Sequence, residues 1–406
     1  MLDSHKDKTK VLIIILSILT YVLIFFFKEY SPSGSQVDFN SFVFKNIQIF
    51  KNDFYFAIKN YGLLGDGNYP LFYIVHAYLN PFSSSPSAYL ISTSIIGFIT
   101  FLIFGLSLKN LKFNNIDSLL FSSLILLLPW FNGRAHWGTS ANLGLLFLII
   151  SFYFFTKIKN NKNNFDFKNL FLLTFFSSAA LYTRNSFIFF PIFLIFYFFI
   201  NNLNFKYKKW LILNYIFFSI PGFILIFLWG GIFDTKNIDI FSLHSPKNII
   251  KNIPILLNFL FFYLWPVFFI ELNKIGSNKF FHKYFFSFIT ILMIFALLTL
   301  FGKMEYLSNY ILGGGVTLEF GYLVGDKFNT IFLITSAIGL SFLFSFLKFD
   351  FKNNFILFAL IFIIFGFPKA LYQDYLEPLF IFLFFLGIIN SNAIYYLKNN
   401  TLKLST

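Results

Sequence analysis

The sequence of 406 residues contains no cysteine, which excludes disulfide bonds, thiolate metal ligands and a cysteine nucleophile. Charged residues are scarce as well: they make up 12% of the chain, whereas a soluble domain carries about 25%. Short catalytic patterns are also missing, among them HExxH, a Ser-His-Asp arrangement and a nucleotide-binding fingerprint. With so few charged side chains, most of the protein surface must face lipid instead of water.

Apolar residues are abundant and occur in long runs. They make up 57% of the chain, whose mean hydropathy is +0.73. Runs such as Val11–Phe27 and Phe285–Phe301 are long enough to cross a bilayer as a helix. The sequence therefore predicts an all-α integral membrane protein, a single transmembrane domain with about 12 membrane-spanning helices. The predicted spans are 11–27, 87–108, 117–131, 139–155, 169–183, 186–200, 210–229, 253–271, 284–301, 328–347, 353–367 and 378–397.

Two of these predicted spans, 169–183 and 186–200, are short enough to form one tilted helix. The distribution of lysine decides between the two interpretations. With two helices, 19 of the 31 basic residues fall in one set of short loops, as expected for the cytoplasmic side. The sequence therefore favours a helical hairpin and cytoplasmic N- and C-termini. The basic N-terminus and the run 11–27, which has no small-residue cleavage site, predict a retained signal-anchor.

The formal net charge of +14 reflects this topology and does not indicate nucleic-acid binding. Of the 17 acidic residues, 11 fall in the other set of loops, so the two faces differ in charge. Basic loops on one face attract anionic lipid headgroups. We therefore expect membrane lipids as partners and no nucleic acid. The outer loops are longer and chemically richer, and function should lie there. They are 28–86, 132–138, 230–252, 302–327 and 368–377.

The first outer loop, 28–86, contains an amphipathic pattern. Apolar residues recur every three or four positions from Phe39 to Tyr61, and polar residues fill the other side. This pattern predicts a juxtamembrane helix that lies in the membrane interface. Asp38 directly precedes it. Asp is a good helix N-cap, and it is also a candidate catalytic acid at the membrane surface; the two roles are compatible.

A turn and a second short helix follow in the same loop. The segment Gly62–Pro70 holds three glycines and Asp66, and predicts a turn-rich connection. The segment Pro70–Pro81 is apolar but too short to span a bilayer. It predicts a second juxtamembrane helix.

The order of these features resembles the N-terminal half of the GT-C glycosyltransferases. A span is followed by Asp38, an amphipathic helix, a Gly/Asp turn and the segment YPLFYIVHAYLNPF. After the next span and a basic loop comes LLPWFNGRAHWGTSANLGLLFLIISFYFF, with a Pro and an Arg at its turn. This order resembles in particular the bacterial protein O-mannosyltransferase and lipid A aminoarabinose transferase type. The resemblance covers residues 10–200. Residues 201–406 correspond to the C-terminal half of those enzymes, which varies within the superfamily.

The resemblance implies a transferase of a bacterial inner membrane with an extracytoplasmic active site. It would take a sugar from a polyprenyl-phosphate donor and pass it to a glycan, lipid or protein acceptor. Asp38 would be the catalytic base on the acceptor hydroxyl. Asp66 would be a further catalytic acid, and Asp53 a secondary acid that binds the acceptor. A divalent cation, if one takes part, would bind Asp38 and Asp66.

The chain has only two arginines, Arg134 and Arg184. Its other 29 basic residues are lysines. Both fall on predicted outer turns. Since a guanidinium binds phosphate through paired hydrogen bonds, Arg134, Arg184 and the nearby His136 are candidates to bind the donor phosphate. The alternative for each arginine is an interfacial anchor whose stem lies along apolar surface.

The outer loop 302–327 adds Lys303, Glu305 and Glu319 as candidate acceptor-binding residues, although solvation of an ordinary loop explains them better. Two other functions stay open: a lipid-linked glycan transporter or flippase, and an outer-leaflet oligosaccharide polymerase or ligase. Ionisable residues inside the spans are scarce, which disfavours a transporter. Polymerases and ligases usually carry their main catalytic loop in the second half of the chain.

Overall fold

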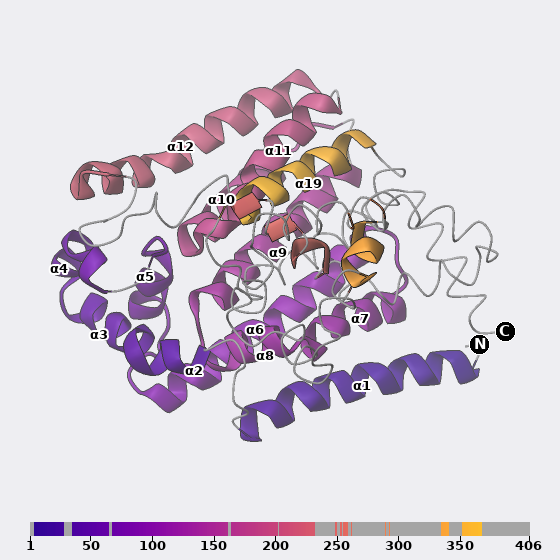
Figure 1. Ribbon diagram of the computed structural model, residues 1–406, viewed down its shortest axis with the longest axis horizontal. Helices are drawn as coiled ribbons and strands as arrows, with labels where there is room; N and C mark the ends of the chain where they lie inside the picture. Colours follow the sequence, from indigo (N-terminus) through magenta and orange to yellow (C-terminus); the bar gives the residue numbers. More distant parts are fainter. Residues whose placement is uncertain are drawn as a thin grey trace. The chain divides into compact units, whose positions relative to one another are not determined.

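The chain divides into two compact units, 1–239 and 240–406. In the computed structural model, the described residues are 4–27, 35–64, 67–160, 164–201, 203–231, 248–249, 252–253, 255–258, 261, 289, 292, 334–340 and 351–367. All regular secondary structure among them is helical, as Figure 1 shows for the first unit. The fold class predicted from composition is confirmed to this extent.

The first unit contains twelve labelled α-helices among its described residues, with short π-helical and 3-10 turns between some of them. They are α1 (Ser4–Phe27), α2 (Ser35–Asp38), a π-helical turn (Phe39–Val43), α3 (Phe44–Asn52), α4 (Phe54–Lys59), a 3-10 turn (Tyr61–Leu64), α5 (Leu71–Tyr78), α6 (Pro86–Asn110), α7 (Asn115–Ser123), a 3-10 turn (Leu124–Leu127), α8 (Pro129–His136), α9 (Ser140–Asn160), α10 (Phe167–Thr183), a 3-10 turn (Asn185–Ile188), α11 (Phe189–Ile200) and α12 (Phe205–Trp229). In the second unit, α19 spans Phe351–Gly366.

Four helices of the described chain are long and apolar enough to cross a membrane. They are Asp7–Phe27, Pro86–Asn110, Ser140–Asn160 and Phe205–Trp229. Large apolar side chains on α12 are exposed, for example Phe223 at 65% and Phe227 at 87%. A surface of this kind is stable against lipid but not against water. The predicted spans 253–271, 284–301, 328–347 and 378–397 lie wholly or largely outside the described residues.

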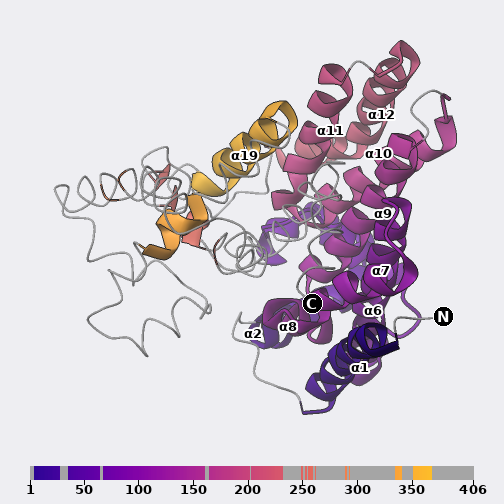
Figure 2. The same ribbon diagram turned by 90° about the vertical axis from the view of Figure 1, so that its right-hand side faces the viewer.

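The helices of the first unit run alternately up and down. The side chain of Lys10 near the start of α1 contacts Asp117 at the start of α7, and Tyr21 Oη near the end of α1 donates to Ser94 O near the start of α6. These two contacts make α1 antiparallel to α6. Figures 1 and 2 show α1 lying along α6 and α7.

The hairpin predicted from the lysine distribution is confirmed. Helix α10 ends at Thr183, Arg184 is extended, and a new helical segment starts at Asn185. The far end of α11 lies near the start of α12, because the rings of Phe198 and Tyr207 are 6.0 Å apart. Since Tyr207 Oη accepts a hydrogen bond from the backbone N–H of Asp166 just before α10, α11 returns antiparallel to α10.

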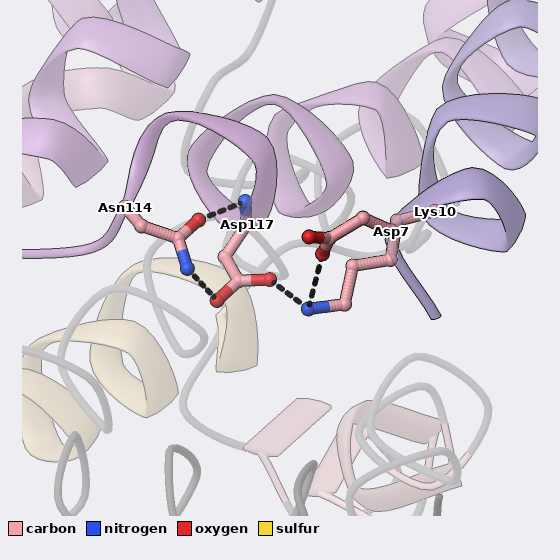
Figure 3. A network of polar contacts seen from close by, with 4 residues as sticks. All are labelled: Asp7, Lys10, Asn114 and Asp117. Atoms are coloured by element: carbon pink, nitrogen blue, oxygen red, sulfur yellow. Dashed lines mark hydrogen bonds and ion pairs between the residues drawn. The ribbon is translucent and has the colours of Figure 1, made fainter. Parts of the chain in front are cut away.

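This alternation places lysines of the predicted cytoplasmic loops at one end of the unit. Lys109 and Lys157 lie in the last turns of α6 and α9, and Lys168 and Lys206 in the first turns of α10 and α12. The same end holds a network in which Lys10 Nζ contacts Asp117 Oδ1 at 2.7 Å (Figure 3). Asp117 also accepts from the side-chain amide of Asn114, and Asp7 contacts Lys10 at 3.9 Å.

The predicted span 117–131 is not one helix. Its helical part stops at Leu127, and Leu128 is extended because the residue before a proline avoids helical backbone. Pro129 then starts α8, a position where its missing N–H costs nothing. This break separates α8 from the preceding helix, and α8 carries Arg134.

The helices of residues 35–64 and 71–78, named here the loop layer, cover the opposite end of the unit (left in Figure 1). The predicted amphipathic helix is confirmed in its periodicity but broken at Asp53, which caps α4. Its apolar side chains, among them Ile47 and Phe50, are fully buried and pack on α5 and on Tyr89 of α6. They therefore contact protein, whereas the sequence predicted contact with the membrane interface.

Gly138 connects α8 to α9 with a left-handed backbone, at φ +59°. A Cβ atom at Gly138 would lie 2.6 Å from Thr93 Cγ2 and 2.7 Å from Tyr89 Cε1. Gly138→Ala is therefore expected to lower the free energy of unfolding by about 2–4 kcal/mol, through backbone strain and overpacking. Thermal unfolding in detergent measures this loss. Gly67→Ala is the control, because a Cβ there meets nothing within 4 Å; equal stability of the two variants would contradict the prediction.

Candidate functional site

Asp38 lies inside a continuous helical segment and does not act as a helix N-cap. Its backbone is helical, at φ −59° and ψ −46°, and its side chain makes no capping hydrogen bond. A π-helical turn, Phe39–Val43, follows directly; such turns often occur at functional sites. The capping interpretation of Asp38 is therefore wrong. The chain continues as a helix on both sides of Asp38, which leaves its carboxylate available for other contacts.

The carboxylate of Asp38 forms an ion pair with Arg134, 96 positions further along the chain. Arg134 Nη1 donates to Asp38 Oδ2 at 3.0 Å. Helices α2 and α8, which carry the two residues, lie side by side (Figures 1 and 2). The Arg134 side chain is 8% exposed and that of Asp38 is 36% exposed. A nearly buried guanidinium requires a counter-charge, so the pair fixes the two groups against each other.

Aromatic residues next to the pair hold its backbone in place. Phe39 is buried, and its ring stacks on Tyr89 at 5.9 Å and contacts Trp137 at 5.8 Å. The hydroxyl of Tyr89 donates to the carbonyl of Gly138. The π-helical turn after α2, the start of α6 and the end of α8 therefore meet around Phe39, directly beside Asp38. The periodic pattern identified Phe39 as apolar, but the sequence alone did not connect it with Trp137.

His136 lies two residues after Arg134 but packs against other helices. Its ring is 4.5 Å from that of Tyr21 and 5.5 Å from that of Phe25, both on α1. Its Nδ1 is 2.9 Å from Ser94 Oγ, and its Nε2 is buried. Burial lowers the pKa of His136 from 6.5 to about 4, so the ring is neutral at pH 7. It can offer a hydrogen bond to a phosphate, but no positive charge.

This pKa makes stability depend on pH. Between pH 6.5 and 4 the unfolded chain binds a proton that folded His136 does not, so stability falls as the pH falls. The loss amounts to up to about 1.4 kcal/mol per pH unit. We expect His136→Gln to lessen the decrease in unfolding temperature between pH 7 and 4.5. His76, whose pKa burial lowers to about 3, is present in both proteins, so the comparison isolates His136. Parallel pH profiles would refute the assignment.

Arg184 lies at a different point of the same end of the unit. It follows the last residue of α10 and is 4% exposed. The next residue, Asn185, holds the loop that follows Asp66: its side chain donates to Gly67 O at 2.7 Å and accepts from Tyr69 N at 3.3 Å. Asn185 was not predicted, because asparagine is common in this chain and carries no signal by itself. Asp66 lies outside the described residues.

Of the remaining predicted site residues, one has a different role and three lie outside the described part of the chain. Asp53 Oδ1 accepts a hydrogen bond from the backbone N–H of Phe56 and thereby caps α4. Lys303, Glu305 and Glu319 lie outside the described residues. Within the described part of the chain, no three His, Asp or Glu side chains converge as metal ligands. One oxygen of Asp38 faces the Arg134 guanidinium, and Asp66, the other predicted ligand of a divalent cation, lies outside the described residues.

The sequence matches no known protein-family model, and no curated protein is significantly similar to it.

Proposed function

We propose that this protein is a membrane glycosyltransferase that moves a sugar from a polyprenyl-phosphate donor to an acceptor hydroxyl. The observation that carries the proposal is the ion pair between Asp38 and Arg134. Sequence reasoning assigned these residues separately, one as a catalytic acid and one as a phosphate ligand. Their contact joins the two parts that such a reaction needs: a carboxylate to take a proton and a fixed cation to receive a phosphate.

The proposed reaction is a displacement at the anomeric carbon of the donor sugar. The carboxylate of Asp38 accepts the proton of the acceptor hydroxyl, and the acceptor oxygen forms a bond to the anomeric carbon. The bond between that carbon and the phosphate oxygen breaks, and polyprenyl phosphate leaves with the electron pair. Arg134 stabilises the negative charge on the leaving phosphate. A guanidinium has five N–H donors, so it can contact Asp38 and a phosphate together.

The proposal also assigns a role to Arg184 and an orientation of the chain in the membrane. Arg184 lies at the same end of the unit as the loop layer, next to the turn bound by Asn185. It is a second candidate for the phosphate, and Asp66 a second acid. In this arrangement about 12 spans cross a bacterial inner membrane, and both termini are cytoplasmic. The loop layer and the ion pair face the extracytoplasmic side, where lipid-linked sugars replace nucleotide sugars as donors.

The test is transfer by the purified wild-type protein in liposomes. A radiolabelled polyprenyl-monophosphate sugar is supplied with a mixed pool of glycan, lipid and protein acceptors from the cell envelope. The expected result is label in a new covalent product and release of unlabelled polyprenyl phosphate. Movement of intact donor between leaflets without a product would instead favour a flippase. Neither product nor movement with any supplied sugar would overturn the choice of donor.

A further inference from the structure

Part of the loop layer exposes large aromatic and aliphatic side chains that the proposed reaction does not use. They are named here the aromatic surface: Phe54 (46% exposed), Tyr55 (70%), Phe56 (49%), Tyr78 (52%) and Leu79 (74%). The rings of Phe54 and Tyr78 are 6.1 Å apart, so α4 and the end of α5 contribute to one continuous surface. Five large exposed side chains in so small an area indicate an interaction surface.

Apart from Phe54, the α4 residues of this surface lie on the side of the helix that faces away from the protein. Ala57 and Ile58 are buried against the rest of the loop layer. Successive helical residues are about 100° apart, so Tyr55, Phe56 and Lys59 lie on the opposite side of α4. The residues that the amphipathic pattern assigned to the membrane interface are, apart from Phe54, a different set, and they are buried.

The end of a membrane-spanning helix fixes the depth of α4 relative to the bilayer. Trp229, the last residue of α12, donates through Nε1 to the backbone carbonyl of Ile58 at 2.8 Å. The 25 residues of α12 extend about 37 Å, longer than a hydrocarbon core of about 30 Å. The end of α12 therefore lies at headgroup level, and so does α4. Phe227 near this end is 87% exposed, so lipid-facing surface continues from α12 to the neighbourhood of α4.

The charges beside the aromatic surface also fit lipid headgroups. Lys51 in the last turn of α3 and Lys59 at the end of α4 are exposed, and Lys59 Nζ lies 5.9 Å from the centre of the Tyr55 ring. Tyrosine and other aromatic rings together with lysine are typical of residues at a membrane–water interface. A protein-binding surface of the same size would not need to lie at the level where a spanning helix ends.

We infer that the aromatic surface inserts into the headgroup region of the phospholipid leaflet at this end of the bundle. Tyr55 and Leu79 contact the upper acyl chains, and Lys51 and Lys59 contact lipid phosphates. The leaflet thereby holds the loop layer, and with it Asp38, at a fixed depth. This inference depends on the membrane-spanning helices and not on the proposed sugar transfer.

The absence of cysteine allows a direct test in the full chain. Tyr55→Cys and Leu79→Cys are labelled with a nitroxide and reconstituted in phosphatidylethanolamine–phosphatidylglycerol liposomes. Collision with oxygen, which concentrates in lipid, is compared with collision with a water-soluble nickel chelate by electron paramagnetic resonance. Phe227→Cys on α12 is the lipid-facing reference, and Lys45→Cys on the exposed side of α3 is the water-facing reference.

We expect both labels in the aromatic surface to show an oxygen-to-nickel collision ratio several-fold above that of Lys45→Cys, and nearer to that of Phe227→Cys. A ratio equal to that of Lys45→Cys would mean contact with water and would overturn the inference. Low collision rates with both reagents would mean contact with protein, such as a second copy, and would overturn it as well. Because no sugar transfer is measured, failure here leaves the proposed function untouched.

Discussion

Asp38→Asn is expected to reduce sugar transfer by at least about 100-fold, the usual contribution of a general base. Asparagine has nearly the same shape as aspartate and can still accept a hydrogen bond from Arg134, but it cannot take the acceptor proton. The measurement is the initial rate of transfer in liposomes at matched protein content. Thermal unfolding is measured in parallel, since the substitution leaves a guanidinium that is only 8% exposed without its counter-charge.

Asp117→Asn is the matched control for this substitution. It also removes one carboxylate from an ion pair, since Asp117 contacts Lys10 at 2.7 Å. That pair (Figure 3) lies at the lysine-rich end of the unit, near the start of α1 and of α7, whereas the loop layer lies at the opposite end. We expect Asp117→Asn to retain transfer within about twofold, because Asp117 contacts Lys10 and does not contact Asp38 or Arg134. An equal loss in both variants would indicate a general effect on folding, and full activity of Asp38→Asn would exclude Asp38 as the base.

Arg134→Gln is expected to lower kcat/KM for the donor by about 10- to 100-fold, because a hydrogen bond to a charged group contributes about 1.5–3 kcal/mol. Its stability cost should be smaller than that of losing Asp38. The carboxylate that remains is 36% exposed and can be hydrated, whereas the guanidinium cannot. Steady-state kinetics with varied donor concentration measures the first effect, and thermal unfolding the second.

The double variant Asp38→Asn/Arg134→Gln tests whether the two residues act as a unit. Residues in direct contact are not additive, so the double variant should lose little more transfer than Asp38→Asn alone. Losses that multiply would show that Asp38 and Arg134 act independently, and the ion pair would then not carry the proposed function. Lys10→Gln, which breaks the pair at the other end, is the control for Arg134→Gln.

Much of the first unit follows from short-range features of the sequence. The apolar runs predicted the spanning helices, because each backbone polar group in lipid must be satisfied within its own helix. The lysine distribution predicted the helical hairpin around Arg184, which the structure has. The scarcity of arginine selected Arg134 as a candidate phosphate ligand, and the resemblance to GT-C enzymes selected Asp38, after the first span, as a candidate acid. These signals are local, or are sums over many loops, so no tertiary contact was needed to detect them.

The contact partners could not be predicted in the same way. An apolar helix face has the same pattern whether lipid or protein covers it, because both are hydrocarbon. Only the folded chain shows that Ile47 and Phe50 are buried in protein, while Tyr55 remains exposed.

By itself, the sequence determined that the described chain is helical and contains helices long and apolar enough to cross a membrane. It also singled out the scarce polar residues Asp38 and Arg134. The tertiary structure decided that the helix stops before Pro129, that α8 then lies beside α2, and that Asp38 meets Arg134 across 96 positions. The physical reason is the distance along the sequence over which each interaction acts. Helix formation and bilayer insertion depend on neighbouring residues, whereas an ion pair between distant segments depends on how every intervening helix packs.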